Sequence, residues 1–306
     1  MYELGQYLSW TRSGEIQLPD FQRGYKWEDE RIRQLLVTVL RGHPMGAVML
    51  LKTGNSQVRF KPRAIEGVDL LLGTEAKYLL LDGQQRLTAL WRALHNNYEN
   101  HRFFLRLEPS EEFGLPYFVD SKALYFNKKN QKWYPEWVKR RTSLWEQRCV
   151  PLEVFCPGAK GQEEFSKWME ECDAEKDDVV LLSRLSTTLA TYNLPYLALS
   201  ESTPKEVALD VFIKMNTTAA PLSTYDIVVA QVEAQVDQSL RDLVGDIRES
   251  TPEIESYAKP QDLVLNASAF LQNRQPNNTT FLQKGFAEQM IENWDDLVKG
   301  IRRAIA

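Results

Sequence analysis

Residues 82–86 read Asp-Gly-Gln-Gln-Arg and follow a short apolar run at 78–81. If that run is a buried strand, it delivers Asp82 to the carboxyl end of a sheet, where ligands bind in open α/β folds. Gly83 lets the backbone turn tightly, and the free amides of a following helix then form a site for phosphate. A cation in the first helical turn, such as Arg86, opposes the helix dipole unless an anion lies nearby. We therefore predict a strand–turn–helix corner that binds an anion such as phosphate, and the motifs described next extend this prediction to a nucleoside triphosphate.

Each polar side chain of this corner has an expected role. Asp82 could hold a Mg²⁺ ion that bridges phosphate oxygens, because Mg²⁺ prefers oxygen ligands. Gln84 and Gln85 could orient a water molecule or a ribose hydroxyl, and Arg86 could stabilise phosphate charge. An ordinary strand–helix turn with Asp82 as its N-cap has the same pattern. Both interpretations stay open at this point.

A second motif lies in a loop that Pro19 and Gly24 bracket, just before a predicted helix. It presents four side chains that suit a phosphate or a stacked base: Gln22, Arg23, Tyr25 and Lys26. The alternative is a structural loop whose aromatic residues enter the core and whose arginine pairs with a surface carboxylate.

A third motif spans residues 211–223, where a helix ends at Asn216 and a polar loop leads to Ser223 or Thr224 as the next N-cap. Lys214 and Asn216 matter for a site only if this loop folds back over the first part of the chain. An ordinary helix–loop–helix has the same pattern.

The elements that would position these motifs change along the chain. The first hundred residues alternate strands and helices: strands at 15–19, 47–51, 78–81 and 103–107, and helices at 29–40 and 84–95. After residue 108, a hairpin at 123–134 precedes long helical patterns at 163–172, 177–192, 204–215, 224–236 and 281 to the end. We therefore predict an α+β protein, with an α/β domain at 1–107 and a mainly helical domain at 108–306 whose 212–223 segment folds back on the first.

The hairpin mixes lysines 128, 129 and 132 with aromatic residues, as single-strand binders do. We favour a solvated hairpin with a buried aromatic face. The helical pattern at 300–306 has no C-terminal cap, which suggests a longer parent protein.

Composition limits the classes of function. The chain of 306 residues has a net charge of −5, but residues 1–150 carry 23 Lys and Arg against 17 Asp and Glu. That basic half could hold an anion-facing surface, although ordinary solvated surfaces explain the same counts. The three cysteines are best explained as free thiols of a cytoplasmic protein, and no apolar run is long enough for a membrane helix. The sequence has neither a P-loop nor a dinucleotide-binding glycine motif.

In their order, the three motifs resemble those of one family: the N-terminal domain of GmrSD-type modification-dependent (type IV) restriction enzymes and related phage-defence proteins. The resemblance rests on the Pro-x-aromatic-Gln-Arg-x-Tyr-x-Trp loop at 19–27, on 82–86, and on Phe212 to Ser223. It implies a ParB/sulfiredoxin-like fold. This chain has Thr-Thr-Ala-Ala at 217–220 where many relatives place a glycine.

The resemblance implies a regulatory or sensor domain that binds and hydrolyses a nucleoside triphosphate with Mg²⁺. Its catalytic residues would be Asp82, Gln84, Gln85 and Arg86, with Asp82 as the metal ligand. The nucleotide-binding residues would be Gln22, Arg23, Tyr25, Gly83, Lys214 and Asn216. Expected partners are modified DNA and a nuclease domain or subunit, with a homo-oligomer left open and no membrane.

Three alternatives follow for the chemistry. The corner hydrolyses the nucleotide and thereby gates DNA cleavage elsewhere, or the nucleotide only shifts DNA binding without turnover. The third alternative, a ParB-like DNA nuclease, is less favoured because the sequence lacks the histidines or clustered carboxylates of metal-assisted hydrolysis. The three histidines all lie at or before residue 101 and cannot build the His-Asn-His nuclease centre of relatives, so we expect no nuclease activity from this chain alone.

Overall fold

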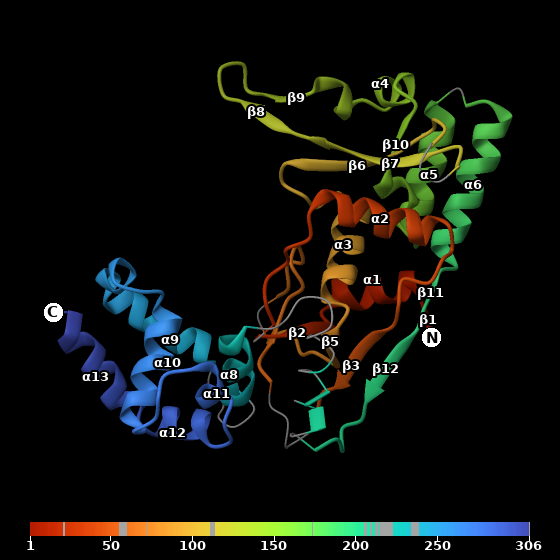
Figure 1. Ribbon diagram of the computed structural model, residues 1–306. Helices are drawn as coiled ribbons and strands as arrows, with labels where there is room; N and C mark the ends of the chain where they lie inside the picture. The colour runs from red at the N-terminus through yellow and green to blue at the C-terminus, as the bar shows by residue number, and fades with distance from the viewer. Residues whose placement is uncertain are drawn as a thin grey trace.

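The fold mixes helices with small sheets, which confirms the predicted α+β class (Figure 1). It was obtained as a computed structural model. The structure describes residues 1–20, 22–54, 60–71, 73–110, 114–172, 174–204, 207–208, 210–211, 214, 223–233 and 239–305. The likeness to the ParB/sulfiredoxin fold stays a prediction.

A five-stranded mixed sheet with the strand order β12-β3-β5-β2-β4 carries the motifs. Its strands are β2 (Ile16–Pro19), β3 (Val48–Lys52), β4 (Pro62–Arg63), β5 (Tyr78–Asp82) and β12 (Tyr196–Leu199). β5 runs parallel to β2 and antiparallel to β3, whereas β12 runs parallel to β3. The strands predicted at 15–19, 47–51 and 78–81 are therefore confirmed within one residue.

Alternate residues of the central strands enter two different cores. Leu50 and Leu80 belong to a cluster that runs from Leu4 to Leu194. Their strand neighbours, among them Leu51 and Leu81, belong to a second cluster with the C-terminal helices. Because side chains alternate across a strand, the sheet is covered on both faces, as its continuous apolar runs predict.

The first core is built by helices from the first two hundred residues. They are α1 (Leu4–Ser13), α2 (Asp29–Leu40), α3 (Gln84–Leu94), α4 (Arg141–Glu146), α5 (Ala159–Glu171) and α6 (Lys176–Ala190). α2 has the predicted bounds, with acidic residues in its first turn and apolar residues on its buried face. α1 had no sequence prediction.

A smaller antiparallel sheet with the order β10-β6-β7 lies above α2 in Figure 1. The strands outside the five-stranded sheet are β1 (Tyr2–Glu3), β6 (His101–Arg106), β7 (Phe118–Ala123), β8 (Tyr125–Asn127), β9 (Lys132–Tyr134), β10 (Cys149–Pro151) and β11 (Asn193–Leu194). β8 and β9 form the predicted hairpin, and β1 pairs with β11. Single-turn 3₁₀ helices lie at Glu136–Lys139 and Leu152–Phe155.

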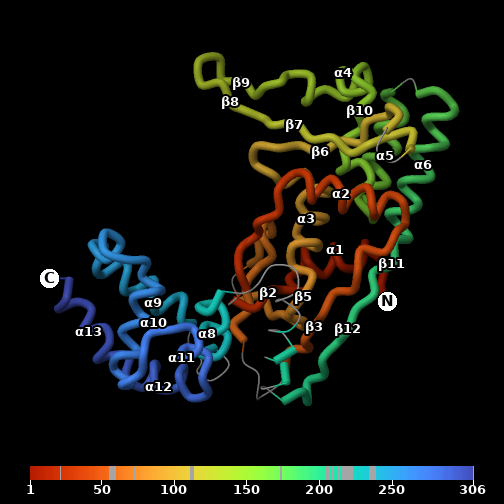
Figure 2. The backbone as a smooth tube through the Cα atoms, in the orientation of Figure 1, coloured from red at the N-terminus to blue at the C-terminus, as the bar shows by residue number. Residues whose placement is uncertain are grey.

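The second core is formed by helices after residue 223, which gather at one side of the molecule (Figure 2). They are α8 (Thr224–Glu233), α9 (Leu240–Ser250), a 3₁₀ helix (Pro252–Ser256), α10 (Pro260–Leu271), α11 (Asn278–Phe281), α12 (Phe286–Glu292) and α13 (Trp294–Ile305). The single helix predicted from 281 to the end is wrong. Gly285 adopts a φ of 85° and starts a new helix, and another helix begins after Asn293.

The predicted domain boundary at 107 stays a prediction. Strand β12 nevertheless adds to the sheet of the first hundred residues, and the first core continues to Leu194. Most of the 212–223 segment, together with part of the helix predicted at 204–215 and the end of that predicted at 224–236, lies outside the described residues.

Candidate functional site

The segment 82–86 forms a tight corner between a strand and a helix. β5 ends at Asp82, and Gly83 adopts a left-handed φ of 96° as the N-cap of α3. A Cβ atom at this position would lie 2.7 Å from Cγ1 of Val48, so only glycine fits without a shift. No side chain caps the helix. Asp82 as the N-cap is therefore wrong, and the choice between an ordinary strand–helix turn and a ligand site is not decided by the cap.

Arg86 forms hydrogen bonds to three groups around this corner. Its Nη1 donates to the carbonyl of Met45 at 2.8 Å, and its Nη2 donates to the carbonyl of Ala47 at 2.9 Å. The same Nη2 lies 3.1 Å from Oδ2 of Asp82, and the two side chains are 19% and 26% exposed. Asp82 thus supplies the anion that a cation in the first helical turn needs.

The two glutamines hold residues 22–26, here called the motif loop, against the start of α3. Nε2 of Gln84 donates to the carbonyl of Arg23 at 2.6 Å, and Nε2 of Gln85 donates to that of Gly24 at 3.2 Å. Oε1 of Gln85 accepts from the backbone N–H of Lys26 at 2.9 Å. Both amides are therefore engaged with backbone groups, and their expected role toward a water or a ribose stays a prediction.

Gln22 holds the N-terminal end of the motif loop against β5 through side-chain hydrogen bonds. Its side chain is buried, and Nε2 donates to the carbonyl of Leu81 at 3.0 Å and to that of Leu80. Its Oε1 is buried without a hydrogen-bond partner among the described residues. The guanidinium of Arg63 donates to the carbonyls of Gln22 and Arg23 at 2.9 and 3.2 Å. The structure thus brings the first two motifs together as one hydrogen-bonded unit.

Tyr25 points into the protein. Its hydroxyl lies 2.9 Å from that of Tyr98, and its backbone N–H donates to the carboxylate of Glu66 at 3.1 Å. Burial raises the pKa of Tyr25 to about 12. The guanidinium of Arg92 lies over the ring of Tyr98 at 4.3 Å. These contacts give Tyr25 a structural role in holding the loop.

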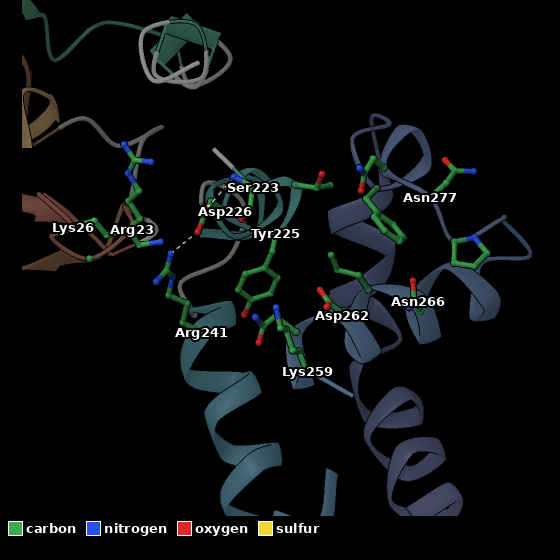
Figure 3. Close-up of a pocket in the computed structure, with 17 residues that line it drawn as sticks. Arg23, Lys26, Ser223, Tyr225, Asp226, Arg241, Lys259, Asp262, Asn266 and Asn277 are labelled. Atoms are coloured by element: carbon green, nitrogen blue, oxygen red, sulfur yellow. Dashed lines mark hydrogen bonds and ion pairs between the residues drawn. The ribbon is translucent and has the colours of Figure 1, made fainter. Parts of the chain in front are cut away.

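Arg23 and Lys26 face a different environment. Both line a polar cleft of about 1070 Å³ between the motif loop and the C-terminal helices (Figure 3). Neither side chain has a hydrogen bond or an ion pair with another described residue, so the alternative in which Arg23 pairs with a surface carboxylate has no support. Unpaired Arg and Lys side chains in a cleft are suited to bind phosphate.

The opposite wall of the cleft comes from residues far along the chain. Arg241 at the start of α9 and Lys259 before α10 contribute further positive charge. Asp226 in α8 accepts from the guanidinium of Arg241 at 2.8 Å and from Oγ of Ser223 at 2.6 Å. Ser223 also accepts from the N–H of Asp226 at 3.1 Å, which confirms the predicted N-cap.

Sequence reasoning missed this wall. The Ser-x-x-Asp spacing at 223–226 was a readable capping signal, but it says nothing about a cleft. Nothing local marks Arg241 or Lys259, because only the packing of the helices brings them opposite the motif loop.

Two predicted residues belong to the third motif. Lys214 is exposed and its Nζ lies 2.7 Å from Oδ2 of Asp210. Asn216 lies outside the described residues, so the closure of a site by this motif stays a prediction. Within the described part of the chain, no cluster of three or more His, Cys, Asp or Glu side chains could hold a metal ion.

Comparison with known families identifies one that covers most of this chain. Residues 4–233 match the family described as GmrSD restriction endonuclease, N-terminal domain. The chain belongs to this family. The match covers the motif loop, the corner at 82–86 and all of α8, whereas the wall residues from α9 onward lie beyond it.

A similar curated protein is an uncharacterized protein of Methanocaldococcus jannaschii, 25% identical over 236 residues. The aligned region covers 71% of this chain but 39% of that relative. This GmrSD-family chain therefore spans about two-fifths of the length of the relative it matches. None of the described helices combines the length and apolar character that a membrane span requires.

Proposed function

We propose that this chain is the nucleotide-binding and nucleotide-hydrolysing sensor domain of a restriction system that acts on modified DNA. The observation that carries the proposal is the pair Arg23 and Lys26, which face the polar cleft without a protein partner among the described residues. Arg241 and Lys259 face them from the opposite wall. Two carboxylates, Asp226 and Asp262, also line the cleft, and Asp226 pairs with Arg241, so the proposal rests on Arg23 and Lys26.

The hydrogen bonds of the corner explain how the motif loop is kept in place. Gln22, Gln84 and Gln85 fix its two ends and its backbone, so Arg23 and Lys26 are presented with little loss of backbone entropy on binding. In this proposal the triphosphate lies against Arg23 and Lys26.

A Mg²⁺ ion is part of this proposal with Asp82 as its ligand, although neither Asp82 nor Arg86 is among the residues that line the cleft. Arg86 engages Oδ2 of Asp82, whereas Oδ1 accepts no hydrogen bond from a described residue. One carboxylate is enough for Mg²⁺ when phosphates and water supply the remaining ligands. Asp82 would hold the ion, which would neutralise phosphate charge when bound. Arg86 keeps Asp82 oriented.

A nucleotide clamp without turnover is the second candidate, and one observation favours it. Gln85 engages both its amide nitrogen and its amide oxygen with backbone groups of the motif loop, so it presents no free oxygen to an attacking water. Catalysis by Gln85 then requires these bonds to rearrange, whereas binding of a nucleotide does not.

Phosphate release from the four nucleoside triphosphates, with and without modified DNA, separates these functions. Hydrolysis by the wild type that Asp82→Asn abolishes supports the proposed function. Tight binding of a nucleotide without phosphate release under any condition supports the clamp. The absence of binding for all four nucleotides would overturn both.

A further inference from the structure

The β8–β9 hairpin projects from the smaller sheet, far from the C-terminal helices (Figures 1 and 2). Its strands pair in antiparallel register from Tyr125 opposite Tyr134 to Asn127 opposite Lys132. None of its four aromatic residues belongs to either hydrophobic core among the described residues. The hairpin is thus not explained by packing.

The aromatic residues lie on both faces of the hairpin in cross-strand pairs. The rings of Tyr125 and Tyr134 are stacked, with centroids 5.5 Å apart and an interplanar angle of 18°. Phe126 and Trp133 form the second pair at 5.5 Å. Tyr125 is 62% exposed and Phe126 is 40% exposed, so the expected buried aromatic face is wrong. Exposed aromatic rings that a partner ring holds in place form a ready stacking platform.

The surroundings of the platform are strongly basic. Residues 122–141 contain seven Lys and Arg and one acidic residue, Glu136, in a chain with a net charge of −5. Lys132 pairs with Glu136 at 3.1 Å. Lys128 and Lys129 at the exposed turn have no carboxylate partner among the described residues. Positive charge beside stacking rings matches a polyanion that carries flat bases.

We propose that the hairpin is a binding surface for single-stranded DNA. Lys128 and Lys129 contact two backbone phosphates, and an unpaired base stacks on the exposed face of Tyr125. A duplex offers phosphates but keeps its bases stacked inside, so it cannot use the tyrosine. The proposal deepens the proposed function and rests on it for DNA as the partner, but the surface is separate from the nucleotide cleft.

Fluorescence anisotropy with a labelled 20-nucleotide single strand, over a range of salt concentrations, tests the surface. The double variant Lys128→Ala/Lys129→Ala should bind at least about tenfold more weakly at 0.1 M salt. The slope of log affinity against log salt should fall in magnitude by about 1.4, because each single-strand phosphate contact contributes about 0.7. The exposed pair Lys176→Ala/Lys284→Ala removes the same charge elsewhere and should change binding less than twofold.

The stacking step has its own test. Tyr125→Ala should weaken single-strand binding about 5- to 160-fold, which corresponds to the about 1–3 kcal/mol that base stacking on one aromatic residue contributes. Tyr125→Phe keeps the ring and should bind like the wild type. Equal binding by Tyr125→Ala, or a matched duplex bound as tightly as the single strand, overturns the stacking proposal. Equal loss in the Lys176/Lys284 control overturns the phosphate contacts.

Nucleotide calorimetry on the same variants distinguishes this proposal from the proposed function. The Lys128→Ala/Lys129→Ala protein should keep wild-type nucleotide affinity while it loses DNA. If the wild type binds no nucleotide but still binds DNA through the hairpin, the proposed function fails and this inference stands. If nucleotide binding holds and no variant of the hairpin changes DNA binding, the inference fails alone.

Discussion

The buried carboxyl of Glu233 should give this protein an unusual dependence of stability on pH. Glu233 is the last described residue of α8 and is 1% exposed. Burial, and next the negative charge of Asp20 at the end of β2, raises its pKa to about 8, while Arg241 opposes that rise. Asp20 also accepts from Oγ of Ser239 at 2.5 Å. This cluster joins the end of β2 to the C-terminal helices.

The size and sign of the effect follow from linkage. The ordinary glutamate pKa is 4.5, so between that pH and about pH 8 the native state holds a proton that the unfolded state has lost. The free energy of unfolding therefore falls as the pH rises, by about 1.4 kcal/mol per pH unit. Over the whole window the loss is about 3–5 kcal/mol. Below pH 4.5 both states hold the proton, so stability is not reduced. Above about pH 8 both states have lost it, so the reduction no longer grows with pH.

Glu233→Gln isolates the contribution of this ionisation to stability, because glutamine matches the protonated carboxyl in size and cannot ionise. Urea unfolding at pH 5, 6, 7 and 8 should show the variant gaining stability over the wild type by about 1.4 kcal/mol per unit. The exposed Glu249→Gln serves as the control and should track the wild type at each pH. Parallel curves for Glu233→Gln and the wild type would refute the reasoning.

Three further predictions concern the corner. Gly83→Ala should lower the free energy of unfolding by about 2–4 kcal/mol in urea melts, because the backbone φ of Gly83 is left-handed and the new Cβ meets Val48. An unchanged unfolding midpoint contradicts this prediction. Arg86→Lys keeps the charge but loses the planar guanidinium fork that reaches Met45, Ala47 and Asp82, and should cost about 1–3 kcal/mol in the same melts. Gln84→Ala removes the shorter of the two hydrogen bonds to the carbonyl of Arg23 and leaves the one from Arg63, so hydrogen exchange in the motif loop should accelerate while α2 stays protected.

Local patterns in the sequence were enough to predict the strands and helices that carry the motifs. α2 was predicted to the residue because an apolar stripe, acidic first-turn residues and a terminating Gly-x-Pro all agree. β3 and β5 were predicted as buried strands from their uninterrupted apolar runs. Both faces of these strands are covered, and that feature underlies their pattern.

The features that the sequence did not predict depend on packing between residues far apart in the chain. β12 joins the sheet beside β3 although about 140 residues separate them, and no local pattern records such a pairing. The split of the C-terminal helical pattern depends on the left-handed φ of Gly285, which the apolar periodicity hides. The cleft wall at Arg241 and Lys259 likewise depends on how distant helices pack. The hydrogen bonds of Gln84 and Gln85 to the motif loop were not predicted, because the sequence pattern assigned these side chains to a ligand.

Titration calorimetry of Arg23→Ala with Mg²⁺ and a nucleoside triphosphate tests the central claim most directly. The wild type should bind a nucleotide, and Arg23→Ala should bind it at least about tenfold more weakly, as loss of one charge-assisted contact predicts. Arg31→Ala removes an exposed arginine from α2 and should leave the affinity unchanged. Equal affinity of Arg23→Ala and the wild type would contradict the account.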